Sequence, residues 1–166
     1  MAETSIKVVL SSSEQELVKH IAPQRTMSNR SERIINKRVG DQSDEFTDLN
    51  GFGGGLAFCK AMNLYPDFDI IAAGGDDLWD AKLPDGRRVD VKTSHYATAN
   101  LVARKVQDDV DVFVLVRGQL PAYEIVGYAT RQELVEAPKQ DLGHGPTHFL
   151  AAKDLRPVHE LFDSFQ

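Results

Sequence analysis

The feature that most constrains the fold is the stretch DAKLPDGRRVDVKTS at residues 80–94, in which two runs flank a turn. Leu-Pro-Asp-Gly suits a type I turn with Pro at its second position, followed by a glycine in the left-handed region. This predicts a three-residue hairpin loop with a bulge. The register that follows pairs Leu83 with Arg87, Ala81 with Val89, Asp80 with Asp90 and Leu78 with Lys92.

The predicted register gives the hairpin two different faces. The core face is apolar and carries Trp79, Ala81, Leu83, Val89 and Val91. The polar face carries Asp80, Lys82, Arg88, Asp90 and Lys92. A two-residue loop would instead pair Ala81 with Asp90 and place the two carboxylates on opposite faces. The apolar pattern favours the three-residue loop.

The polar face brings two carboxylates together. Asp80 directly opposite Asp90 destabilises the hairpin unless a cation lies between them. Carboxylate oxygens are ligands that Mg²⁺ prefers. Lys92 projects on the same side, where it would orient or deprotonate a metal-bound water or stabilise negative charge on a phosphate. The alternative is a solvated polar face, on which the basic side chains neutralise the two acids.

The order of the remaining segments predicts an α/β (α+β) fold with a central mixed sheet of four or five strands, flanked by helices. Further strands are expected at Ile70–Ala73, Val110–Val116 and Ala122–Thr130, the last two paired, with a strand or bend at Asn100–Val106. Helices are expected at Ser13–Ala22, ended by Pro23, at Ser28–Arg38 and at Leu56–Asn63, with a short one in RQELVEA. The polar stretch GDQSDEFTDLNG is expected to be a loop, with at most one turn of helix. The glycines of GFGGG are expected at a helix start, because each costs about 1 kcal/mol inside a helix.

Length and composition indicate one domain over residues 1–166, with a basic helical segment at about 13–40. No apolar run approaches the length of a membrane span, and the N-terminus does not resemble a secretory signal. The one cysteine, Cys59, lies in an apolar context. A buried thiol in a reducing compartment follows, so we expect a cytoplasmic protein without a membrane partner.

The charge is unevenly distributed. The net charge is −6, yet residues 19–40 hold six basic residues and one acid. A basic arm on an acidic body is compatible with phosphate contact. The candidate contacts in this arm are Arg30, Arg33, Lys37 and Arg38. The alternative interpretation is a solvated helix face, because charge clusters of this kind are common.

Asp80, the hairpin and the triplet Asp90-Val91-Lys92 resemble the core of the PD-(D/E)XK nuclease superfamily. The resemblance to small phage-type members covers about residues 10–157, including NGFGGGLAFCKAMNLYPDF, DVFVLVRG and YEIVGYATRQEL. It implies a restriction-endonuclease-like fold and a DNA endonuclease that cleaves phosphodiesters with Mg²⁺ or Mn²⁺. Asp80, Asp90 and the Val91 carbonyl would be metal ligands, and Lys92 the catalytic lysine. For a phage protein, the compartment would be the cytoplasm of a bacterial host.

The chain departs from this pattern at one position. Related sequences often carry a glutamate at the start of the helix after the glycines, and Gly55 stands there. The acids that could reach in from the preceding segment are Asp44, Glu45 and Asp48. Asp77 is the alternative to Asp80 if the register differs. Otherwise the site binds metal weakly, or the protein is an inactive nuclease-fold protein that binds nucleic acid or a host protein.

Several other residues are weighed against simpler roles. His95 follows the triplet and is a candidate contact for substrate phosphate, or a hydrogen-bonded loop histidine. Tyr96 and Arg104 are candidate DNA contacts, and a purely structural role is an equal alternative for both. No Gly-Lys-Ser/Thr follows GFGGG, which argues against a phosphate-binding P-loop. Many nucleases of this type act as dimers, so a homodimer is expected as an alternative, although no surface identifies its interface.

Overall fold

The structure, a computed structural model, describes residues 4–31, 44–66, 68, 79–143 and 145–163. The strands are β1 Ile6–Val9, β2 Ala81–Lys82, β3 Arg88–Ser94, β4 Leu101–Ala103, β5 Val112–Gln119, β6 Ala122–Thr130, β7 Lys139–Asp141 and β8 Pro146–Leu150. The helices are α1 Ser12–Ser31, α2 Asp44–Met62, α3 Arg131–Glu136 and α4 Glu160–Asp163, with a 3₁₀ helix at Ala152–Asp154.

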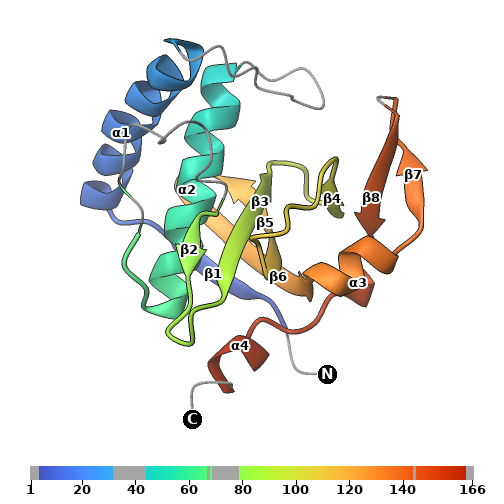
Figure 1. Cartoon of the computed structure of the whole chain (residues 1–166). Helices are drawn as coiled ribbons and strands as arrows, with labels where there is room; N and C mark the ends of the chain where they lie inside the picture. The colour runs from blue at the N-terminus through green and yellow to red at the C-terminus, as the bar shows by residue number, and fades with distance from the viewer. Residues whose placement is uncertain (1–3, 32–43, 67, 69–78, 144, 164–166) are drawn as a thin grey trace.

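The centre of the fold is a mixed five-stranded sheet with the strand order β1-β6-β5-β3-β2 (Figure 1). β3 and β5 run parallel, while the other neighbouring strands are antiparallel. The predicted α/β (α+β) class with a central mixed sheet is therefore confirmed, as is the pairing of β5 with β6. β1, which pairs with β6 at one edge, was not predicted, and the strand predicted at residues 70–73 lies outside the described residues.

The hairpin has the predicted register. Ala81 pairs with Val89 in β2 and β3, and the Leu83 amide donates a 2.8 Å hydrogen bond to the Arg87 carbonyl. Gly86 has φ +95°, the left-handed conformation that the turn requires. β2 is only two residues long, shorter than the predicted run, so β3 extends well beyond its partner.

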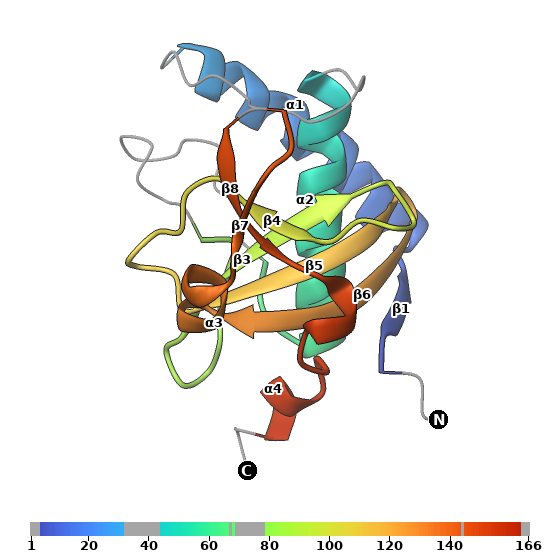
Figure 2. The same cartoon turned by 90° about the vertical axis from the view of Figure 1, so that its right-hand side faces the viewer.

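The two faces of the central sheet are covered differently (Figure 2). α1 and α2 cover the first face, where Val18, Phe58, Val89, Val91, Val112 and Val114 belong to the first core. α3 and a second sheet, ordered β4-β8-β7, cover the other face. Its core contains Leu101, Ala103, Val110, Phe113, Leu115, Ala129 and Leu134. Helices therefore flank the sheet as predicted, but one face also carries a small sheet that was not predicted.

The first helix is longer than its sequence signals indicate. α1 continues through Pro23 to Ser31, so the predicted end at Pro23 is wrong. A capping box at the start of the helix joins the backbone and side chains of Ser11 and Glu14. Val18, Ile21 and Ala22 are buried against the core, and such packing can outweigh the local cost of a proline. The predicted second helix falls partly in α1 and otherwise outside the described residues.

α2 begins at Asp44, so the predicted loop there and the predicted helix start at the glycines are both wrong. The glycines lie in the middle of the helix, because the helix passes very close to the sheet. A Cβ at Gly53 would lie 2.1 Å from Tyr123 Oη, and one at Gly54 would lie 2.0 Å from Thr93 Oγ1. Close packing thus compensates for the low helix propensity of glycine.

The prediction for Cys59 is confirmed in one respect, because the thiol is buried in α2. Among the described residues, no helix is long and apolar enough to cross a membrane. In the C-terminal part, β7 and β8 form an antiparallel hairpin.

Candidate functional site

The centre of the candidate site is the carboxyl pair of Asp80 and Asp90. Asp80 precedes β2, and its amide donates a 2.7 Å hydrogen bond to the Val89 carbonyl. Its Oδ2 accepts a 2.7 Å hydrogen bond from the Val91 amide. The carboxyl group of Asp80 therefore lies along the edge of β3, beside Asp90. The sequence predicted this pairing, but it did not reveal the contact with the Val91 amide.

The environment of Asp80 disfavours its charged form. Burial, and then the negative charge of Asp90, raise the pKa of Asp80 to about 8. The Val91 amide lowers it, a hydrogen bond with the Asp90 carboxyl raises it, and the charge of Lys92 lowers it. The net effect favours the protonated form of the Asp80 carboxyl when no cation is bound.

Lys92 forms an ion pair with Asp90. Its Nζ lies 2.7 Å from Asp90 Oδ2, and the side chains of Lys92 and Asp90 are 40% and 13% exposed. Burial opposes its charge, but the charge and hydrogen bond of Asp90 and the charge of Asp80 outweigh burial and raise the pKa of Lys92. A protonated lysine suits the stabilisation of negative charge better than the removal of a proton from water.

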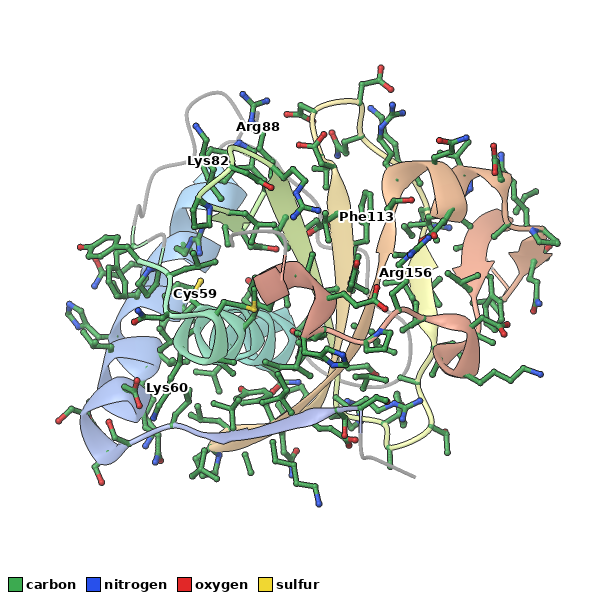
Figure 3. All side chains as sticks on the ribbon, turned by 90° about the horizontal axis from the view of Figure 1, so that it is seen from below. Cys59, Lys60, Lys82, Arg88, Phe113 and Arg156 are labelled. Atoms are coloured by element: carbon green, nitrogen blue, oxygen red, sulfur yellow. The ribbon has the colours of Figure 1, made fainter. Side chains whose placement is uncertain are left out.

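Asp90 and Lys92 lie on the face of β3 that is turned away from α2. They pair with Phe113 and Leu115 of β5, which belong to the second core. Figure 3 shows Phe113 on the side of the sheet opposite to Cys59 of α2. Asp90 is therefore largely enclosed, while Lys92 is half-exposed and neutralises it, as the alternative interpretation expects of this lysine.

Trp79 is not on the predicted face. It packs against the second core rather than with Ala81 and Leu83 on the first. The alternation of side chains holds only while a residue is in a paired strand, and β2 begins at Ala81. The prediction failed because it extended the alternation beyond the paired residues.

The donor atoms at this site fit a hard cation with bound waters. The two carboxyl groups come from Asp80 and Asp90, and the Val91 carbonyl points to the same edge of β3 as the Val91 amide that contacts Asp80. Oxygen ligands of this kind suit Mg²⁺ or Mn²⁺. Among the residues that the structure describes, no group of three or more His, Cys, Asp or Glu could hold a metal.

The third carboxylate was expected at the position of Gly55 or in the segment before it. Gly54 is the residue that faces Thr93, whereas a Cβ at Gly55 would meet no atom within 4 Å. Asp48 is described and does not join the carboxyl pair in a metal-binding group. The side chains of Asp44 and Glu45, and all of Asp77, lie outside the described part of the chain.

The loop after β3 brings three rings together. The His95 ring meets Phe46 of α2 edge-on at 5.3 Å and lies 4.0 Å from the Tyr96 ring, centroid to centroid. The sequence singled out His95 and Tyr96 as separate candidates. Phe46 was missed, because a contact between residues so far apart in the chain leaves no local signal.

The basic arm is mostly outside the described residues. Arg33, Lys37 and Arg38 belong to the segment that is not described, and so does the side chain of Arg30 in α1. Arg25, earlier in the same arm, lies over the Phe52 ring at 5.3 Å from its centroid. A role for these cations in substrate binding stays a prediction.

Comparison with known proteins adds no family assignment. No protein-family model matches the chain, and a search of curated proteins finds no match. The resemblance to the PD-(D/E)XK superfamily therefore stays a prediction from the sequence. The geometry of the carboxyl pair and Lys92 is a separate observation, and it carries the functional argument.

Proposed function

We propose that this protein is a metal-dependent DNA endonuclease that hydrolyses phosphodiester bonds. Its active site would consist of Asp80, Asp90 and Lys92. The observation that carries the proposal is the partly buried carboxyl pair, in which burial and then the charge of Asp90 raise the pKa of Asp80 to about 8. Like charges placed together in this way are costly to keep without a cation. A divalent cation bound between the two carboxylates would remove that cost, and the pair would then serve as its ligands.

The residues would divide the work as follows. Asp80, Asp90 and the Val91 carbonyl would hold Mg²⁺ or Mn²⁺, and the Val91 amide keeps the Asp80 carboxyl oriented at 2.7 Å. The bound metal would supply an activated water and charge neutralisation at the phosphate. Lys92, whose raised pKa favours its protonated form, would stabilise negative charge that develops on the phosphate oxygens.

The test is cleavage of supercoiled and single-stranded DNA with Mg²⁺ or Mn²⁺ at low salt. We expect metal-dependent cutting by the wild type and none by Asp90→Ala or Lys92→Ala. Lys82→Ala is the matched control, because Lys82 is an exposed lysine on the same hairpin. A folded wild type that cuts neither DNA with either metal would contradict the proposal.

The second candidate is a nuclease-fold protein without activity that binds nucleic acid or inhibits a host protein. It is supported by the lack of a third carboxylate in the described part of the site. A folded wild type that binds DNA at low salt but cuts none with either metal would favour this candidate over the first.

A further inference from the structure

The ring pair of His95 and Tyr96 presents an aromatic surface beside the candidate site. Tyr96 is 47% exposed although its ring lies against that of His95. The two rings lie 4.0 Å apart and are tilted by 35°, and Phe46 supports His95 from behind at 5.3 Å. Tyr96 is thus anchored through His95 while much of its surface is open to solvent.

The backbone that carries Tyr96 is held in place. Its amide donates to Ser94 Oγ at 3.3 Å, and its carbonyl accepts from the Ala99 amide at 3.2 Å. The guanidinium of Arg117 in β5 donates two hydrogen bonds to the Ala99 carbonyl, at 2.6 and 3.0 Å. A ring presented from a braced turn loses little conformational freedom when it binds a ligand.

The ring pair is close to the residues that would hold the phosphate. Tyr96 follows Lys92 by four residues, so the chain between them spans at most about 14 Å. A DNA strand whose phosphate lies at Lys92 would therefore bring a base of a neighbouring nucleotide towards Tyr96.

We propose that His95 and Tyr96 form a stacking platform for an unpaired base, so that the substrate of the proposed nuclease is single-stranded DNA. This inference rests on the proposed function. Within a duplex, base faces are covered by their neighbours, whereas an unpaired base offers its face to an aromatic side chain. The net charge of −6 agrees with this choice, because one strand carries half the phosphate charge per length of a duplex.

The experiment measures binding without cleavage. Fluorescence anisotropy compares dye-labelled oligothymidylate with a duplex of equal length, using Asp90→Ala as the background so that the DNA stays intact. Adding Tyr96→Leu is expected to weaken single-strand binding about 5- to 100-fold and to change duplex binding less than about twofold. Tyr96→Phe keeps the ring and should bind single strands like the background protein.

Three results would overturn the inference: no single-strand binding by the background protein, no loss with Tyr96→Leu, or an equal loss for duplex and single strand. The thermal midpoint of each variant shows whether it is folded, and an exposed ring should be replaceable without loss of the fold. Hydrolysis of methyl p-nitrophenyl phosphate by the wild type tests the proposed activity separately, because this diester carries no base. Stacking and hydrolysis can then fail independently.

Discussion

The two faces of β3 show opposite ways of using the same strand. On one face, Val89 and Val91 pack into the first core, and Thr93 meets the backbone of α2 at Gly54. On the other face, Asp90 holds Lys92 in an ion pair beside Asp80. The first face is built from apolar contacts and close approach, and the second from charges.

The apolar face of β3 stabilises the fold, whereas the charged face forms the candidate site. Apolar burial and the close fit at Gly54 account for why α2 lies where it does. The carboxyl pair, in contrast, opposes stability, since burial and mutual repulsion raise the pKa of Asp80. A local arrangement that costs stability without a structural return is typical of a functional site.

The largest effect is expected from Asp90→Asn, which removes the charge and keeps the shape. Under the proposed function, the cleavage rate with Mg²⁺ should fall at least about 100-fold, because a metal ligand and the partner of Lys92 are lost. The free energy of unfolding without Mg²⁺ should change little, since the repulsion with Asp80 and the ion pair with Lys92 are removed together. Single-turnover cleavage and urea unfolding measure the two quantities. Unchanged cleavage would contradict the assignment of Asp90.

The second prediction concerns pH and stability without metal. The pKa of Asp80 is about 8 in the folded protein and 3.8 in its ordinary state, so between these values the folded protein binds more protons. The free energy of unfolding should therefore fall as pH rises from about 4 to 8, by at most about 5 kcal/mol. Urea unfolding in EDTA at pH 5 and pH 8 measures this loss.

Asp80→Asn is the matched variant for this pH dependence. The amide does not titrate, so the loss of stability between pH 5 and pH 8 should be much smaller than in the wild type. An equal slope in both proteins would show that Asp80 is not the group responsible.

The third prediction concerns the opposite face of β3. Gly54→Val should lower the free energy of unfolding by about 2–3 kcal/mol, because its Cβ would lie 2.0 Å from Thr93 Oγ1. Gly55→Ala is the control: its Cβ meets no atom within 4 Å, and it should raise stability by about 0.5–1 kcal/mol. Similar effects of the two substitutions in urea unfolding would argue against the close contact of α2 with β3.

The smallest effect is expected from adding Mg²⁺ to the folded protein. Metal binding needs both carboxyl groups without protons, so stabilisation should be larger at pH 8 than at pH 5.5. At ten times the dissociation constant, it would be about 1.4 kcal/mol. Thermal unfolding with and without Mg²⁺ measures this difference. An equal shift of the midpoint in Asp80→Asn would place the metal elsewhere.

The bounds of α1 and α2 show why part of the fold could not be predicted from the sequence. Pro23 and the glycines of α2 are local signals for a helix end or start, yet both lie inside helices. The cost of the glycines is compensated by close packing against residues far away in the chain, Thr93 and Tyr123. At Pro23, the neighbouring Ile21 and Ala22 are buried in the core. A single sequence shows the cost and not the distant partner.

The sequence by itself determined the hairpin register and thus the meeting of Asp80 with Asp90, because turn chemistry and strand alternation act over a few neighbouring residues. It also determined the pairing of β5 with β6, which a short turn connects. Only the tertiary structure decided how deeply the two carboxyls are enclosed, that Lys92 pairs with Asp90, and that Phe46 supports His95. Burial and long-range contacts set these properties, and they exist only once the layers have packed.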